Sequence, residues 1–120
     1  MLPVQSELRG QARTVLVVVL PAKLVDETAE PVREAVRTGL PNADGAGVVL
    51  DCAAVGLINS LGITCLLQVQ DHCRKRGAPL VLAGVPDGIV AFLSRLKLDA
   101  RFPRAASVDE AVVRIDRGAA

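Results

Sequence analysis

Ser60 is the side chain whose type and position suggest chemistry, because it stands where a loop meets a predicted helix. The apolar run Val48–Asp51 before it is typical of a strand, and Leu61–Arg76 after it has apolar residues at helical spacing. We therefore expect Ser60 to be the N-cap of this helix, its hydroxyl accepting a hydrogen bond from a backbone N–H of the first turn. Gly62 would leave the approach to Ser60 open, because it has no side chain. A helix N-terminus favours negative charge, so the position suits a phosphorylated serine, although a serine that only caps the helix fits it too.

The histidine and cysteine side chains do not complete a catalytic or metal site. His72, the single histidine, lies about three turns beyond Ser60 on the same predicted helix, too far to act as its base. Cys52, Cys65 and Cys73 are an odd set without a CxxC pair, and no second group of ligands accompanies them. No glycine-rich loop with a lysine is present to hold a nucleotide phosphate. We predict a protein that is not an enzyme, with reduced cysteines packed inside, a surface histidine, no metal and no cofactor.

The composition predicts one packed domain. The chain has 120 residues, 51% of them apolar and 22% charged, which is enough for a single core. With only two aromatic residues, that core must be aliphatic. The net charge of +1 is scattered, which argues against direct binding to nucleic acid or to an anionic membrane. The longest apolar run, Val15–Leu20, is too short to span a membrane, and no signal-peptide pattern is visible, so we expect a cytoplasmic protein.

Strand-like and helix-like segments alternate along the chain. The predicted strands are an edge strand at Pro3–Leu8, buried strands at Thr14–Leu20, Val48–Asp51 and Pro79–Ala83, and a short strand within 102–105. The predicted helices run from Thr28 to Gly39, Leu61–Arg76, Pro86–Leu96 and Val108–Asp116. This order predicts a small α/β sandwich with a central mixed sheet of four to five strands and about four helices.

Several residues mark where the predicted helices begin and end. Thr28 is expected to cap the first helix, with Pro31 tolerated in its first turn, where its missing N–H needs no partner. Gly77 should end the second helix, and Pro86 should occupy the first position of the third. Ser107-Val108-Asp109-Glu110 has the pattern of a capping box, which predicts the start of the last helix.

The ordered set of segments resembles the STAS domain family, which comprises bacterial anti-sigma-factor antagonists and cytoplasmic domains of sulphate transporters. Val48-Val49-Leu50-Asp51 followed by Leu57-Ile58-Asn59-Ser60-Leu61-Gly62-Ile63 is similar to its signature. Residues 77–85, 92–102 and 107–111 are similar to the elements that follow, and residues 22–29 to the family's Gly-Glu-Leu-Asp-x-x-Thr-Ala stretch. The resemblance runs from about Thr14 to the end, and we treat residues 1–120 as a single STAS domain.

The resemblance implies an anti-sigma-factor antagonist that works as a switch. The unmodified form would bind an anti-sigma factor that is also a serine/threonine kinase, which frees a sigma factor; phosphorylation on Ser60 would release the kinase, and a serine phosphatase would reverse it. The expected partner-binding residues are Ile58, Asn59, Ser60, Leu61, Gly62, Lys23 and Asp26.

Two departures from the family pattern lie close to this site. Asn59 stands where the most regulated members carry an acidic residue, and Val25 stands at a second acidic position, with Asp26 one residue late. Both changes are expected to reduce the negative charge beside Ser60. The alternative functions are a non-phosphorylated STAS interaction module, for example a cytoplasmic subunit of a lipid-transport ABC complex, and an enzyme or small-ligand binder.

Overall fold

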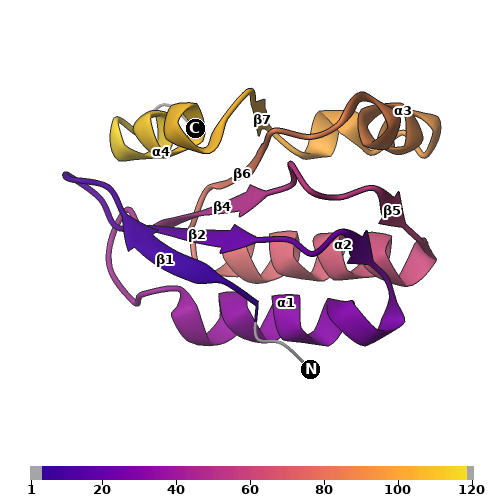
Figure 1. Cartoon of the computed structure of the whole chain (residues 1–120). Helices are drawn as coiled ribbons and strands as arrows, with labels where there is room; N and C mark the ends of the chain where they lie inside the picture. The colour runs from indigo at the N-terminus through magenta and orange to yellow at the C-terminus, as the bar shows by residue number, and fades with distance from the viewer. Residues whose placement is uncertain (1–3, 119–120) are drawn as a thin grey trace.

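A five-stranded mixed sheet forms the centre of the computed structural model, which describes residues 4–118 (Figure 1). Its strand order is β1-β2-β4-β6-β7, with β1 antiparallel to β2 and every other neighbouring pair parallel. These strands are β1 Ser6–Arg9, β2 Val15–Val19, β4 Gly47–Asp51, β6 Leu80–Ala83 and β7 Arg104–Ala105. A separate parallel pair joins β3 Lys23–Leu24 to β5 Leu57–Ile58. The mixed sheet of four to five strands predicted from the sequence is confirmed.

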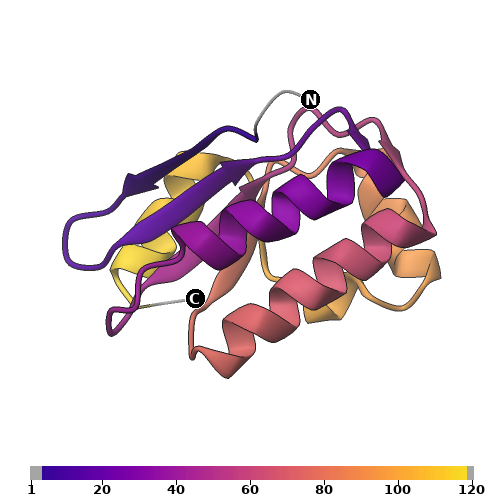
Figure 2. The same ribbon diagram turned by 90° about the horizontal axis from the view of Figure 1, so that it is seen from below.

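Helices cover both faces of this sheet. They are α1 Asp26–Gly39, α2 Ser60–Lys75, α3 Asp87–Arg95 and α4 Val108–Asp116, with a short 3-10 helix, η1, at Asp99–Arg101. Helices α1 and α2 lie side by side under one face, and α4 lies over the other (Figures 1 and 2). None of the helices within residues 4–118 is both long and apolar enough to cross a membrane.

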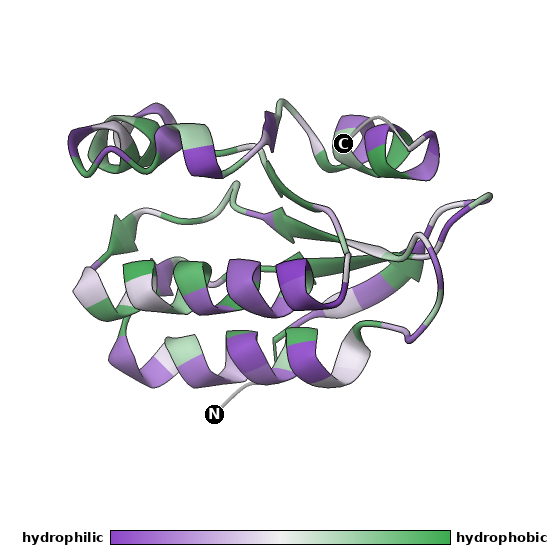
Figure 3. Cartoon of the chain, turned by 180° about the vertical axis from the view of Figure 1, so that it is seen from behind, coloured by the Kyte–Doolittle hydropathy of each residue, from purple (hydrophilic) through white to green (hydrophobic). Residues whose placement is uncertain are grey.

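Alternation along the buried strands explains why both faces need a cover. In β2, Leu16 and Val18 pack toward α1 and α2, whereas Val15 and Val17 pack toward α4. All four are at most 2% exposed, as expected for a continuous β-branched and aliphatic run in a parallel sheet. Figure 3 shows this pattern as hydrophobic strands between helices that carry both hydrophobic and hydrophilic residues.

Most predicted element boundaries lie within a few residues of the observed ones. Ser107 is the N-cap of α4, as predicted, and its Oγ accepts from the Glu110 N–H over 3.1 Å. The capping box is only half formed, because the Glu110 carboxylate accepts from the N–H of Ala106 over 3.2 Å and not from that of Ser107. Gly77 follows the end of α2 with a φ of 66°, the left-handed conformation expected after a helix C-terminus. Pro86 is the N-cap of α3 and not its first residue. Residue 3 of the predicted edge strand lies outside the described residues.

The predicted start of α1 was wrong by one turn. Val25 is the N-cap, and Thr28 lies in the third helical position, where Oγ1 accepts from the Val25 N–H over 2.9 Å. The same hydroxyl donates to the Lys23 carbonyl over 2.6 Å, so Thr28 ties the helix start to β3. Pro31 consequently falls in the second turn of the helix and not in the first. Asp26 and Glu27 extend the helix because acidic side chains stabilise a first turn.

Candidate functional site

Pairing of β3 with β5 assembles the candidate site from two distant stretches of sequence. Lys23 is opposite Leu57 and Leu24 is opposite Ile58 in this short parallel pair. Because β3 leads into α1 and β5 leads into α2, the N-termini of both helices lie at the same edge of the molecule (Figure 1). The predicted segments around Lys23–Asp26 and 58–62 are therefore brought together.

Asn59, and not Ser60, is the N-cap of α2. Its Oδ1 accepts a hydrogen bond from the Gly62 N–H over 3.0 Å. Its Nδ2 donates to Asp26 Oδ1 over 2.9 Å, so one amide side chain connects the starts of two helices. Asparagine and serine are both good N-cap residues, and the N-cap of α2 is the asparagine, which comes first in the sequence. The prediction that Ser60 caps the helix was wrong.

The correction leaves the Ser60 hydroxyl available. Ser60 is the first residue of α2 and is exposed, and no hydrogen bond within residues 4–118 uses its hydroxyl. Its carbonyl accepts from Thr64 Oγ1 over 3.0 Å, an ordinary contact one turn along the helix. The first turn of α2 itself contains no acidic residue, and the helix dipole favours an anion there.

Asp26 places a carboxylate close to Ser60, because its side chain contacts that of Asn59, the preceding residue. Asn59 and Val25 are still neutral, but the side chain of Asp26 keeps one carboxylate in contact with this site. Asp26, one position later in the sequence than the family's acidic residue, therefore still lies at the site. Exposed Glu27 follows it in the first turn of α1.

Gly62 serves a different purpose from the one expected. It is buried, and a Cβ built on it would lie 2.1 Å from the Leu24 carbonyl oxygen and 2.8 Å from Ile58 Cγ1. No other residue would allow α2 to approach β3 so closely. Gly62 thus allows the close packing of α2 on β3 that places the exposed residues at the start of α2.

Two exposed leucines flank Ser60. Leu61 is 48% exposed, as its predicted role in binding requires, and Leu57 is 51% exposed. Sequence reasoning missed Leu57, although an apolar residue directly before the predicted binding segment was a usable signal. Ile58 is partly buried against the core, and Lys23 is exposed. Ser60 thus has exposed leucines on both sides in the sequence, and Asp26 and Glu27 lie in the first turn of the neighbouring α1.

The cysteines lie apart from this surface. Cys52, Cys65 and Cys73 are free and buried, and burial raises the pKa of their thiols from 9.0 to about 12, about 11 and about 11. His72 is partly buried, not the surface histidine that was predicted, and its Nε2 is enclosed without a hydrogen-bond partner among the described residues. Within residues 4–118, no three His, Cys, Asp or Glu side chains gather as metal ligands would.

Comparison with known proteins agrees with this architecture. The STAS domain family matches residues 5–111, so the chain belongs to the STAS domain family. An anti-sigma-factor antagonist (STAS) domain protein from Planctomyces limnophilus has a similar structure, with a TM-score of 0.75, 20% identity and coverage of 92% of this chain and 96% of that one. No curated protein sequence matches the chain.

Two further structures show the range of proteins that share the fold. The anti-sigma factor antagonist SpoIIAA, in its unphosphorylated form, has a TM-score of 0.73 and 17% identity, over 95% of this chain and 97% of that one. The murine anion transporter Slc26a9 has a TM-score of 0.70 and 17% identity, over 88% of this chain but only 18% of the transporter. At these identities the likeness shows a common fold.

Proposed function

We propose that this STAS domain is an anti-sigma-factor antagonist whose binding to an anti-sigma factor serine/threonine kinase is switched off by phosphorylation of Ser60. The family match and the similar structures of anti-sigma-factor antagonists support this class of function. In the proposed cycle the unmodified protein binds the kinase in the cytoplasm and frees a sigma factor, and a serine phosphatase restores that form. The protein itself catalyses no step and binds no nucleic acid.

The exposed and unused hydroxyl of Ser60 is the observation that carries the proposal. Asn59 provides the cap, so the serine is not needed to hold the helix. Ser60 is exposed at the helix start, where a kinase can reach it. His72 is about three turns away along α2, so the site lacks the nearby histidine that would suggest a hydrolase.

A phosphate at Ser60 would change the character of the surface more than its structure. Leu57 and Leu61 offer apolar area that a partner can cover. Phosphorylation would add a charge of about −1.5 to −2 beside these leucines and close to Asp26, so docking would require desolvating several anionic groups. The helix N-terminus stabilises the same phosphate in the free protein. Both effects favour release of the partner without refolding.

Phosphorylation is tested by intact-mass measurement after incubation with ATP and candidate serine kinases of the histidine-kinase-like type. The wild-type protein should gain one phosphoryl group, and Ser60→Ala should gain none. Thr64→Ala is the matched control, because Thr64 is an exposed hydroxyl residue one turn away on the same helix. Thr64→Ala should be phosphorylated like the wild type.

Measuring how the Ser60 variants bind the same kinase then distinguishes a signalling role of Ser60 from a purely structural one. Ser60→Ala should bind it and should not be released by ATP, whereas Ser60→Asp, with one added charge, should bind it more weakly. If Ser60→Asp binds like the wild type and phosphate is found on Thr64 or nowhere, the proposal fails. The non-phosphorylated interaction module, such as a subunit of a lipid-transport complex, would then replace it.

A further inference from the structure

The two edges of the central sheet differ in how their outward backbone groups are used. At one edge the carbonyls of Pro103 and Ala105 face β6, so the Arg104 carbonyl between them faces outward. The Arg114 guanidinium donates to this oxygen over 2.9 Å and covers the edge. The other edge is β1, and Figure 2 shows it along the outside of the molecule with no other element of residues 4–118 beyond it. β1 is therefore the open edge of the sheet.

Ser6 and Leu8 direct their backbone groups away from the sheet. The Val19 N–H donates to the Gln5 carbonyl over 2.9 Å, so Gln5 faces β2. Backbone groups alternate in direction along a strand of an antiparallel pair, so the odd-numbered residues of β1 face β2 and the even-numbered ones face outward. Within residues 4–118, no backbone hydrogen bond joins Ser6 or Leu8 to anything outside the β1–β2 pair. Such an edge is free to pair with another strand.

The side chains of β1 combine one exposed leucine with two opposite charges. Leu8 is opposite Leu16, on the face that α1 and α2 cover, but it is 58% exposed because it lies at the outer edge. Glu7 and Arg9 are opposite residues of β2 that pack toward α4, so both charges lie on the other face. Arg9 pairs with exposed Asp109 over 2.8 Å, whereas Glu7 has no ion-pair partner within residues 4–118.

We infer that β1 pairs with β1 of a second copy of this chain, antiparallel about a twofold axis that passes through Leu8. In this register each Leu8 N–H donates to the Leu8 carbonyl of the other copy, and the two exposed leucines are opposite each other. Glu7 of each copy is then opposite Arg9 of the other, so the pairing contains two ion pairs. They occupy non-hydrogen-bonded positions, where opposite side chains are closest.

Charge complementarity selects both the occupant and the register. Shifting the axis by one residue would place Glu7 directly opposite Glu7 of the second copy, and like charges at such positions are destabilising. A guanidinium has five N–H donors, so Arg9 can keep Asp109 and also hold the glutamate of the other copy. The strand of a second copy therefore supplies the apolar residue and both charges that this edge requires.

The pairing leaves the surface around Ser60 free. β1 and β5, the strand that leads into Ser60, lie toward opposite ends of the molecule (Figure 1). A dimer joined through β1 would carry two separate Ser60 sites, and its formation does not depend on phosphorylation of either one.

Sedimentation equilibrium over about 10 μM to 1 mM protein tests whether the dimer forms. The wild type should show a monomer–dimer equilibrium with a dissociation constant within this range, because so short a strand buries less area than a standard interface. Amide hydrogen exchange locates the contact. The Leu8 amide should exchange at least about threefold more slowly at the highest concentration than at the lowest, whereas the Glu7 and Arg9 amides, which face β2, should not change.

Charge reversal tests the register. Glu7→Arg would place arginines opposite each other, and Arg9→Glu would place glutamates opposite each other, so each variant alone should dimerise about tenfold or more weakly. An equimolar mixture of the two variants restores opposite charges at both positions. It should associate as a heterodimer about as tightly as the wild type associates with itself.

Asp109→Asn is the matched control, because it removes the same ion pair within the chain as Arg9→Glu but leaves the pairs between copies intact. It should dimerise at least as tightly as the wild type. Equal weakening by Asp109→Asn and Arg9→Glu would show a local effect on β1 and overturn the proposal. So would a wild-type protein that stays monomeric over the whole range, a Leu8 exchange rate that is independent of concentration, or a mixture that associates no better than its components.

Discussion

Asn59 and Ser60 divide between them two tasks that the sequence alone would give to one serine. The amide of Asn59 caps α2 and holds Asp26 at the start of α1, and it uses both ends of its side chain to do so. The Ser60 hydroxyl is left exposed. A neighbouring cap is thus what makes a serine at a helix start available for modification.

This division predicts that substitutions at these two adjacent residues change the stability of the fold by different amounts. Asn59→Ala removes the cap and the hydrogen bond to Asp26, and should lower the free energy of unfolding by about 1–2 kcal/mol. Ser60→Ala removes an exposed hydroxyl and should change it by less than about 0.5 kcal/mol. Urea denaturation of both variants measures the difference. A larger loss for Ser60→Ala than for Asn59→Ala would show that the serine is the cap after all.

Sequence reasoning placed the start of α2 to within one residue and chose the wrong N-cap for a physical reason. Asparagine and serine have nearly equal N-cap preference, and the apolar pattern of a helix fixes its start only to within a residue or two. As the cap, Asn59 also forms a hydrogen bond to Asp26, which joins residues 33 positions apart. A periodic pattern in one segment cannot reveal that contact.

At the scale of elements, the strands and helices with a clear apolar period were predictable and the short pair β3–β5 was not. Strands β2, β4 and β6 are buried runs, and α4 has its serine N-cap, so local sequence is sufficient for them. β3 and β5 have two residues each, too few to show any alternation. They exist because α1 and α2 start side by side, which only the assembled fold brings about.

Gly62 controls how closely these elements approach. Gly62→Ala would place a Cβ 2.1 Å from the Leu24 carbonyl oxygen, a backbone atom that cannot move aside alone. We expect a loss of more than about 2 kcal/mol in the free energy of unfolding, together with a shift of α2 away from β3. Thermal unfolding measures the first effect, and NMR shifts of the Leu24 and Ile58 amides report the second.

Gly88→Ala provides the matched control, because Gly88 lies in the first turn of α3 with no atom within 4 Å of the added Cβ. This variant should be as stable as the wild type or up to about 1 kcal/mol more stable, since alanine is the better helix former. If both alanine variants behaved alike, the close approach at Gly62 would not be a constraint on the site.

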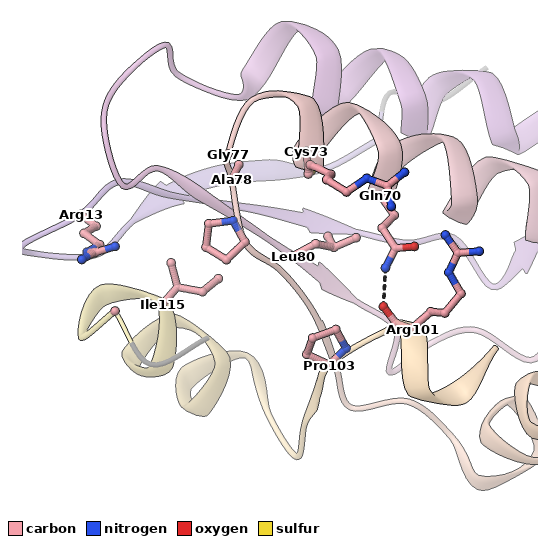
Figure 4. A pocket seen from close by; sticks show the side chains of 12 residues that line it. Arg13, Gln70, Cys73, Gly77, Ala78, Leu80, Arg101, Pro103 and Ile115 are labelled. Carbon is pink, nitrogen blue, oxygen red and sulfur yellow. Dashed lines mark hydrogen bonds between the residues drawn. The ribbon is translucent and has the colours of Figure 1, made fainter.

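At the scale of the whole molecule, α2 connects two surfaces of different character. Its first residue is Ser60, and its second half lines a pocket of about 620 Å³ together with Arg13 and Arg101 (Figure 4). The sequence predicted the first surface because the family signature marks it. It could not predict the pocket, since Arg13, Gln70 and Arg101 come from separate elements and no motif links them.

The side of α2 that faces inward carries two of the three buried thiols, which makes the stability of the fold sensitive to alkaline pH. An unfolded thiol ionises near pH 9.0, whereas burial raises the pKa of Cys73 and Cys65 to about 11 and that of Cys52 to about 12. Above pH 9.0 the unfolded chain therefore loses protons that the folded chain keeps, so ionisation favours unfolding. The stability is complete below that pH and falls as the pH rises toward 11.

Urea unfolding between about pH 8 and pH 10.5 should therefore show a steady loss of stability, with each thiol contributing up to about 1.4 kcal/mol per pH unit. The chain has no tyrosine, so phenol ionisation does not contribute in this range. Cys73→Ala should be less stable at neutral pH, because it leaves a cavity, but its loss with pH should be shallower by about a third. A wild-type protein whose stability is constant over this range would mean that the thiols ionise in the folded state, and that the core around α2 admits water.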